Sequence, residues 1–318
     1  MKTFITGGAG FIGSTMAANL LANANNKITI FDNFLSGQMS YVEPLSKNKN
    51  FNLIKGDLLD LSQIKEAIKG HDFVFHFAAN ADIAKSMIET DLDLKLTVIA
   101  TYNLLEAMRL AGVNKIVYSS GSGVYGDVGL TETPEDFGPL LPTSMYGASK
   151  LGAEGLISAF CYMFDMQSWI YRFANVVGEN QTHGVAYDFI RKLKEQPREL
   201  MILGDGKQSK SYIHITDIID AILYVNQKSK DSVNVYNVAT DDYITVNEIA
   251  DLVTEEMGLN NVQYKYSGGN KGWKGDVPVV RFDLSKIHRL GWKSKYSSKE
   301  AIRKSIREML KQEVKKVS

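Results

Sequence analysis

The segment Thr6-Gly7-Gly8-Ala9-Gly10-Phe11-Ile12-Gly13 spaces its glycines in a way that makes room for a dinucleotide pyrophosphate. It follows an apolar run, Lys2–Thr6, that predicts a strand. Gly7 turns the backbone, Gly10 admits the phosphates without a Cβ clash, and Gly13 lets the next helix lie close to the sheet. That helix presents free N–H groups and the positive end of its dipole to the phosphates. The segment therefore predicts a dinucleotide site at the end of the first strand.

A second predicted strand ends at an acidic residue, Asp32. A carboxylate at this place accepts hydrogen bonds from an adenosine ribose and repels a 2′-phosphate. Residues 33–37 contain no arginine that would bind such a phosphate. The sequence therefore favours NAD over NADP as the cofactor.

The composition is that of an ordinary soluble globular protein, with 44% hydrophobic residues, 23% charged residues and a formal net charge of zero. This balance favours neither nucleic acid nor an anionic membrane as a partner. The single cysteine, Cys161, is expected to be buried packing rather than a nucleophile. The chain begins directly with the first predicted strand and has no run of about 18 apolar residues, so we expect a cytoplasmic protein.

Strand-like and helix-like runs alternate through the first half, which predicts an α/β fold with a Rossmann-type, doubly wound parallel sheet. We expect an NAD-binding domain at residues 1–174, with returning segments near 208–240, and a smaller α/β substrate-binding lobe at 175–318. The expected strands are Lys2–Thr6, Lys27–Phe31, Asn52–Lys55, Phe73–Phe77, Lys115–Ser119 and Ser168–Phe173. The expected helices are Phe11–Ala22, Leu61–Lys69, Leu92–Ala111, Ser144–Phe164, Val185–Lys194, Thr216–Asn226, Val246–Met257 and Lys299–Lys311.

Tyr146 and Lys150 lie one helical turn apart, so their side chains share a face of the predicted helix Ser144–Phe164. A free tyrosine has a pKa of about 10, and a cation nearby favours the phenolate. Such a pair can take a proton from a substrate hydroxyl while the adjacent carbon gives hydride to a nicotinamide. Tyr224 and Lys228 have the same spacing without a cofactor motif around them. We choose the first pair because its helix follows the fifth predicted strand, at the sheet edge where ligands bind.

Together these features resemble the extended short-chain dehydrogenase/reductase family, and in particular its NAD-dependent sugar-nucleotide epimerases and dehydratases. The similarity is greatest to the 4-epimerases that act on UDP-glucose and UDP-galactose, and it runs essentially end to end. The motifs that carry it are Thr6–Gly13, Gly56-Asp57, His76–Ala79, Ser119–Gly126, Tyr146–Lys150, Arg172–Gly178, Tyr212–Asp217 and Gly272–Val277.

The resemblance implies transient oxidation at C4 of a nucleotide sugar, with hydride moving to a tightly bound NAD and the proton to Tyr146. The 4-keto sugar then turns over within the site and takes hydride back on its other face. Lys150 is implied to hold the nicotinamide ribose and to lower the pKa of Tyr146, and Asp57 with Leu58 to lie against the adenine. The implied cofactor-binding residues are Gly7, Gly10, Phe11, Ile12, Gly13, Asp32, Asn33, Asp57, Leu58, Phe77, Ala78, Ala79, Thr97, Ser119, Tyr146, Lys150 and Phe173.

Two departures from the family pattern lie on the cofactor side. Gly121 stands where the family carries a serine or threonine hydroxyl that bridges the substrate O4 and the phenol. We expect Ser122 or Ser120 to supply that hydroxyl as a catalytic group after a small loop shift; alternatively, these serines only satisfy backbone groups of the loop. Thr97 stands where epimerases commonly carry asparagine, and simple packing is the alternative to a cofactor contact.

A third departure lies on the substrate side, where Lys210 and Trp273 stand in the places of two arginines that face the pyrophosphate. Lysine keeps the charge without the bidentate fork. Trp273 is expected either to stack on a base or sugar or to pack at the edge of the core. Asn175 is implied to reach the diphosphate and Asp276 the nucleotide ribose. The implied substrate-binding residues are Tyr125, Asn175, His183, Val185, Lys210, Trp273 and Asp276.

Other chemistries have less support in the sequence. The five histidines form no ligand pair at metal-binding spacing, so no metal is expected, and His76 is interpreted as a core histidine. A dehydratase or decarboxylase would use the same C4 oxidation, but 4,6-dehydratases of this family carry adjacent Asp and Glu where Ser122 and Gly123 stand. An NAD-binding regulator without activity is the non-enzyme alternative, and Gly121 is its only support. We expect a homodimer formed through Leu92–Ala111 and Ser144–Phe164, because these helices are unusually apolar.

Overall fold

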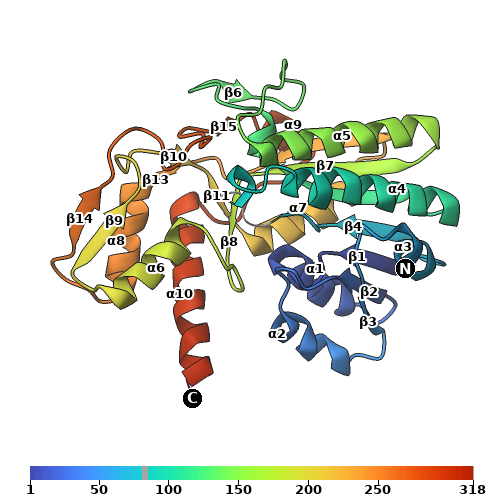
Figure 1. Cartoon of the computed structure of the whole chain (residues 1–318), viewed down its shortest axis with the longest axis horizontal. Helices are drawn as coiled ribbons and strands as arrows, with labels where there is room; N and C mark the ends of the chain where they lie inside the picture. Colours follow the sequence, from blue (N-terminus) through green and yellow to red (C-terminus); the bar gives the residue numbers. More distant parts are fainter. Residues whose placement is uncertain (81–84, 318) are drawn as a thin grey trace. The chain divides into compact units, whose positions relative to one another are not determined.

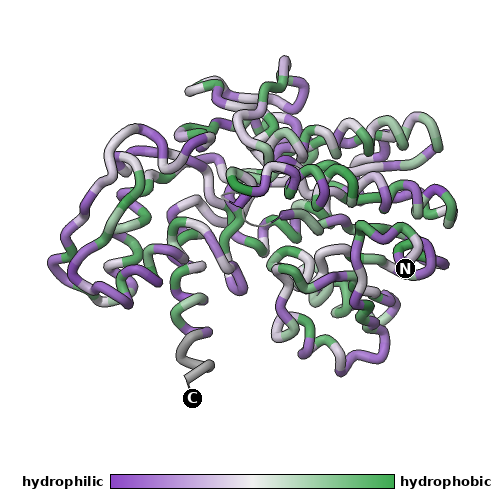
Figure 2. Tube along the Cα trace, viewed as in Figure 1, coloured by the Kyte–Doolittle hydropathy of each residue, from purple (hydrophilic) through white to green (hydrophobic). Residues whose placement is uncertain are grey.

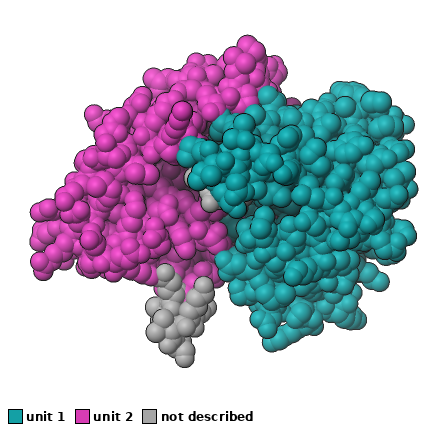
Figure 3. All heavy atoms as spheres, in the orientation of Figure 1, with its two compact units in different colours: residues 1–124, 144–172, 226–236 teal, residues 125–143, 173–225, 237–318 magenta. Residues whose placement is uncertain are grey.

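The computed structural model describes residues 1–80 and 85–317 of the chain (Figure 1). Its contacts divide the chain into two compact units (Figure 3). Unit 1 comprises Met1–Val124, Ser144–Arg172 and Asn226–Tyr236, and unit 2 comprises Tyr125–Thr143, Phe173–Val225 and Asn237–Ser318. The domain boundary that we place at residue 174 stays a prediction.

The main sheet has seven strands in the order β12-β7-β5-β4-β1-β2-β3; of these, β7, β4, β1, β2 and β3 are labelled in Figure 1. Parallel pairing joins β1 to both β2 and β4, β2 to β3, and β4 to β5. The strand order therefore reverses beside β1, which confirms the doubly wound fold and marks the edge where such sheets bind ligands. The strands are β1 (Lys2–Thr6), β2 (Lys27–Asp32), β3 (Phe51–Lys55), β4 (Phe73–His76), β5 (Lys115–Gly121), β7 (Gln167–Phe173) and β12 (Val233–Val238).

Helices pack on this sheet through buried apolar side chains, and hydrophobic and hydrophilic stretches alternate along the chain trace (Figure 2). Leu104 and Met108 of α4 and Ile157 of α5 pack with sheet residues such as Val74 in one buried cluster, which also contains Cys161. The first helix, α1, lies against β1 and β2 and is not part of that cluster. These helices are α1 (Phe11–Leu21), α3 (Leu61–Ala67), α4 (Ala100–Ala111) and α5 (Met145–Met163), with the short α2 (Met39–Val42) and the 3-10 turns η1 (Glu43–Lys47) and η2 (Lys85–Met87) between them.

Unit 2 has its own core, formed around Phe189 and Leu193 of α6 and Ile249 and Val253 of α8. Its helices are α6 (Val185–Glu195), α7 (Ile215–Lys228, whose last turn belongs to unit 1), α8 (Val246–Glu256), α9 (Ser285–Arg289) and α10 (Ser298–Val317). Short strands pair as β8 (Asn175–Val177) with β11 (Tyr212–His214), β9 (Glu199–Ile202) with β14 (Gln263–Tyr266), β10 (Ser209–Lys210) with β13 (Ile244–Thr245), and β6 (Glu132–Thr133) with β15 (Arg281–Phe282).

The six predicted strands are confirmed, and their ends differ from the prediction by two residues at most. The predicted helix Leu92–Ala111 is confirmed as one continuous helical segment, in which a π-helical turn, η3 (Leu94–Ile99), leads directly into α4. The seventh strand of the sheet, β12, was not predicted. Among the described helices, none combines the length and the apolar character needed to cross a membrane.

Candidate active site

The glycine-rich turn after β1 is shaped by close contacts between backbones. Gly7 has a φ of 66°, and a Cβ atom there would lie 2.5 Å from the backbone nitrogen of Ala78. A Cβ atom on Gly13 would lie 2.3 Å from the carbonyl oxygen of Gly7. Gly10 caps α1 without any side-chain hydrogen bond, so the first N–H groups of the helix are available to an anion. The turn therefore fits the pyrophosphate of a dinucleotide.

Asp32 is held at the end of β2, next to this turn. Its carboxylate accepts N–H groups from Ala9 (2.9 Å) and Phe34 (2.8 Å), which leaves a further lone pair on each oxygen for ribose hydroxyls. Burial raises the pKa of this carboxyl, and the two N–H groups oppose the shift. Nearby, the Asn33 side chain donates to Asp57 at 3.3 Å. The structure thus brings together residues predicted to hold the adenosine.

The end of β4 lies beside the same turn. The N–H of Phe77, the first residue after β4, donates to the carbonyl of Thr6 at 3.1 Å. Ala78 and Ala79 follow directly in the chain. His76 is fully buried between the hydroxyls of Thr6 (2.7 Å) and Thr101 (2.9 Å). Burial, with a smaller contribution from the charge of Lys150, lowers the pKa of His76 to about 3. It is a neutral core histidine, as predicted.

The Tyr146–Lys150 pair stands on the first turns of α5, whose cap Ser144 accepts the N–H of Gly147 at 3.1 Å. Lys150 is 2% exposed, and its Nζ donates to the Ser119 carbonyl at 2.7 Å. The same Nζ lies 4.9 Å from the ring centroid of Tyr118 and 5.6 Å from that of Tyr146. Burial lowers the pKa of Lys150 to about 8, although neighbouring carboxylates oppose the shift.

The structure differs from the expectation that Lys150 lowers the pKa of Tyr146. Burial, and secondly the carboxylate of Asp93, raise the pKa of Tyr146 to about 12. The Lys150 ammonium lies toward the ring and is bonded to a backbone carbonyl, so its charge does not offset the burial of the phenol. The phenol is therefore protonated in the ligand-free chain at neutral pH.

Gly121 and Ser120 are the last two residues of β5, and Ser122 follows them directly. Ser120 is 4% exposed, and its hydroxyl has no hydrogen-bond partner in the described part of the chain, so it does not satisfy the loop backbone. Ser122 opens the 3-10 turn η4 (Ser122–Val124), which packs against α5. A Cβ atom on Gly123 would lie 3.4 Å from the Cα of Gly147. Which serine acts in catalysis stays a prediction.

Thr97 lies in the π-turn η3, fully buried. Its hydroxyl has no partner within the residues that the structure describes. A buried unpaired hydroxyl costs free energy, and the contact of Thr97 with the cofactor stays a prediction. The residue lies one turn after Asp93, which the sequence analysis did not single out.

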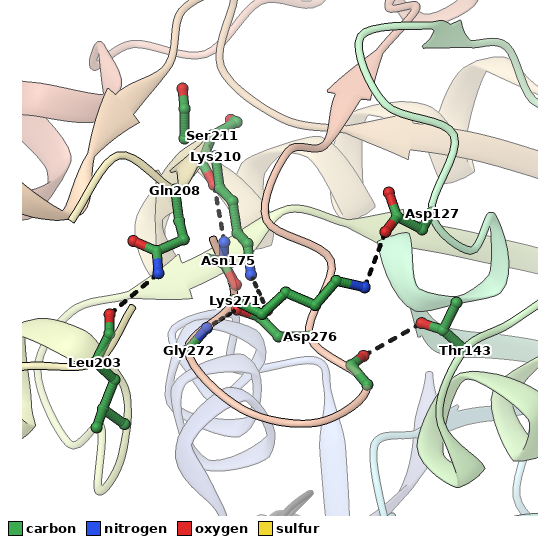
Figure 4. Close-up of polar contacts among 12 residues, drawn as sticks. Asp127, Thr143, Asn175, Leu203, Gln208, Lys210, Ser211, Lys271, Gly272 and Asp276 are labelled. Carbon is green, nitrogen blue, oxygen red and sulfur yellow. Dashed lines mark hydrogen bonds and ion pairs between the residues drawn. The ribbon is translucent and has the colours of Figure 1, made fainter. Parts of the chain in front are cut away.

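Several predicted substrate-binding residues belong to a polar network in unit 2 (Figure 4). The Lys210 Nζ and the Asp276 Oδ1 form an ion pair at 2.7 Å, and the other oxygen of Asp276 accepts the N–H of Gly272 at 3.0 Å. Lys271, in the same loop as Gly272 and Asp276, forms an ion pair with Asp127 at 3.0 Å that helps to hold this loop in place. Asn175 is exposed and its amide makes a long contact of 3.4 Å to the Ser211 carbonyl.

The other predicted substrate residues are placed differently. Tyr125 is 2% exposed, and its hydroxyl donates to Asn237 at 2.7 Å, so its side chain is part of the core of unit 2. Phe173, which was predicted to contact the cofactor, is also buried. His183 is exposed just before α6, which begins at Val185, and Trp273 is half-buried in the loop of the ion pair.

Sequence reasoning missed three residues around Lys150. Tyr118 on β5 contacts its ammonium, and Asp93 and Glu154 act on it electrostatically. Glu154 lies four residues after Lys150, so helical spacing alone could have indicated it. Asp93 could be found only through the packing of η3 against α5.

A glycine-rich turn that fits a dinucleotide and a Tyr–Lys pair on α5 are the features expected of an enzyme that oxidises or reduces a carbinol carbon with NAD. The sequence model described as GDP-mannose 4,6 dehydratase matches residues 4–305. The chain therefore belongs to this family, and it is an NAD-dependent enzyme of the sugar-nucleotide epimerases and dehydratases.

Known proteins from both branches of the family resemble the chain. A UDP-glucose 4-epimerase of Mycolicibacterium smegmatis is 28% identical over 317 residues, covering 96% of this chain and 97% of that protein. The structure of a UDP-glucose 4-epimerase of Thermotoga maritima with UDP-glucose is 30% identical, with a TM-score of 0.88 over 98% of this chain and 99% of that one. A dTDP-glucose 4,6-dehydratase of Bacillus anthracis, solved with NAD, is 25% identical, with a TM-score of 0.86 over 99% and 98% of the chains.

Proposed function

We propose that the protein interconverts UDP-glucose and UDP-galactose, or a related nucleotide sugar, by transient oxidation at C4. The observation that carries this proposal is the surroundings of Tyr146. The neighbouring turn η4 contributes Ser122 and Gly123, and a side chain at 123 would begin 3.9 Å from the Tyr146 ring. Loss of water from the sugar needs a second acid–base group beside the tyrosine, whereas epimerisation needs only the proton that Tyr146 exchanges.

The residues of unit 1 have separate tasks in this reaction. NAD, when bound, supplies the hydride acceptor. Tyr146 takes the proton of the 4-hydroxyl and returns a proton to the same oxygen when hydride is added back to the other face of C4, and its raised pKa suits it to the second of these steps. Lys150 contributes the nearby positive charge that favours the phenolate during the first step.

We infer that the substrate diphosphate is bound by Lys210 with help from Asn175, and the nucleotide ribose by Asp276. The ion pair of Lys210 with Asp276 supports this, because both charges are already held in place without a ligand. A single lysine is a point charge without the planar fork of arginine, so binding of the diphosphate relies on fewer directed hydrogen bonds.

Incubating the purified protein with UDP-galactose and following UDP-glucose by NMR tests the proposal. Formation of UDP-glucose supports it. A 4-keto-6-deoxy product would instead identify a dehydratase. In a parallel incubation with UDP-glucuronate, loss of carbon dioxide would identify a decarboxylase. No turnover of any nucleotide sugar, despite bound NAD, would leave only the alternative of an NAD-binding regulator without activity.

The catalytic hydroxyl can be assigned with two single substitutions, Ser120→Ala and Ser122→Ala. The variant that removes this hydroxyl is expected to lower kcat by about 10²-fold, since one aligned transition-state hydrogen bond is lost. The other variant should stay within a few fold of the wild type. Equal wild-type rates for both variants would show that neither serine bridges the sugar and the phenol.

We infer a homodimer from an exposed apolar stripe on α5. Its members recur every three or four residues: Met145, Ala148, Gly152, Gly155, Ala159 and Tyr162. Beside it, the turn η3 and the start of α4 expose Leu94, Ile99 and Tyr102. A continuous apolar face of this kind suits a second copy of the same helices.

Gly155→Glu tests this interface, because open space surrounds the glycine within the chain. The variant is expected to sediment as a monomer, since a carboxylate would be buried without a partner between the two copies. Ala18→Glu adds the same charge to an exposed position of α1 and should remain dimeric. A wild-type protein that sediments as a monomer at micromolar concentration would refute the dimer.

A further inference from the structure

Lys150 brings an ammonium group into the core, and no carboxylate within the described residues forms a direct ion pair with it. An ammonium has three N–H donors, and one of them is used by the Ser119 carbonyl at 2.7 Å. A buried charge is costly unless it is paired with an opposite one. Among the described residues, the rings of Tyr118 and Tyr146 lie beside Lys150, and the neutral imidazole of His76 and the carboxylates of Glu154 and Asp93 interact with it electrostatically.

Glu154 already has a strong partner of its own. Its two oxygens accept the Arg172 Nε at 3.1 Å and the Arg172 Nη2 at 2.8 Å, a bidentate pair. Both side chains are buried, with 5% of Arg172 and 7% of Glu154 exposed. Because the guanidinium of Arg172 offsets the charge of Glu154, Glu154 compensates the charge of Lys150 only in part.

Asp93 is arranged differently. It is 1% exposed at the start of η3, the turn that packs against α5. Its Oδ1 accepts the amide of Asn80 at 3.0 Å, while its buried Oδ2 has no hydrogen-bond partner among the described residues. A neutral amide orients this carboxylate without neutralising it. Asp93 therefore has no positively charged hydrogen-bond partner of its own among the described residues.

We propose that Asp93 is the counter-ion that keeps Lys150 protonated, and so acts as a positioning residue for the Tyr146–Lys150 pair. Burial alone favours the neutral amine, and Asp93 is the largest opposing contribution. The same negative charge disfavours the phenolate of Tyr146. Asp93 therefore favours the charged form of Lys150 and the neutral form of Tyr146. The consequence for turnover rests on the proposed function, but the charge of Lys150 does not.

Asp93→Asn removes the charge and keeps an oxygen for the Asn80 amide. Asp91→Asn is the matched control: Asp91 lies two residues earlier on the same segment, is exposed, and pairs with Lys95. In protein labelled with ¹³C-lysine, the Cε signal of Lys150, assigned by its loss in Lys150→Arg, reports its protonation. We expect the titration midpoint to fall by about one pH unit or more in Asp93→Asn and to stay unchanged in Asp91→Asn.

The alkaline limb of kcat in the epimerase assay should move to lower pH by the same amount in Asp93→Asn, because the charged amine is lost earlier. A uniform loss of kcat at all pH values, with an unchanged Lys150 midpoint, would overturn the proposal. If Asp93→Asn fails to fold, Asp93→Glu keeps the charge and must keep the wild-type midpoint. If the wild type turns over no UDP-sugar, the proposed function fails, while the titration still decides the role of Asp93.

Discussion

Tyr146→Phe is expected to lower kcat for epimerisation by about 10³-fold while the protein still purifies with NAD. The substitution removes only the hydroxyl, which is the group that exchanges a proton with the sugar. The ring of Tyr146 and its contact with the Lys150 ammonium, 5.6 Å from the ring centroid, are retained. Stopped-flow measurement of NADH absorbance after mixing with UDP-galactose would show whether the oxidation step itself is lost.

The chain offers its own control for this experiment. Tyr224 has the same spacing to a lysine, but its hydroxyl donates to the Leu290 carbonyl at 2.8 Å. Tyr224→Phe should therefore cost about 1 kcal/mol of stability and leave kcat within twofold of the wild type. A Tyr146→Phe enzyme that keeps more than a tenth of the wild-type kcat would place the acid–base group elsewhere.

The cofactor half of the site was predictable because its determinants are local in the sequence. Gly7 and Gly13 are needed because backbones approach closely at these positions, and Asp32 because it stands at the end of a strand. A sequence pattern of a few residues is enough to indicate both features. Strands buried on both faces, such as β4 with Phe-Val-Phe-His, appear as nearly continuous apolar runs. The edge strand β12 has the sequence Val-Asn-Val-Tyr-Asn-Val, and its asparagines conceal it.

The charges around the site were not predictable, because tertiary contacts determine them. Helical spacing places Lys150 beside Tyr146, but whether its ammonium approaches the phenol depends on the Ser119 carbonyl of another element. Lys210 and Asp276 are 66 residues apart and meet only because a loop folds back on β10. In the same way Tyr125, in a motif of the family, is turned into the core by its bond to Asn237.

The second large effect is expected on stability, from Glu154→Leu. This change leaves the buried guanidinium of Arg172 without the carboxylate that accepts two of its N–H groups. Removal of one partner of a buried pair costs about 3–5 kcal/mol, so the midpoint of urea unfolding should fall steeply. Because both side chains are at most 7% exposed, salt should change this cost little.

The double variant Glu154→Leu with Arg172→Met distinguishes the effect of losing the ion pair from the effect of leaving the buried guanidinium unpaired. An apolar pair of similar volume removes the unpaired guanidinium, so we expect the double variant to recover most of the lost free energy of unfolding. Arg109→Met is the matched control, since Arg109 pairs with Glu106 at the surface and should contribute less than about 1 kcal/mol. A double variant as unstable as Glu154→Leu would mean that Arg172 stabilises the fold chiefly through its other contacts.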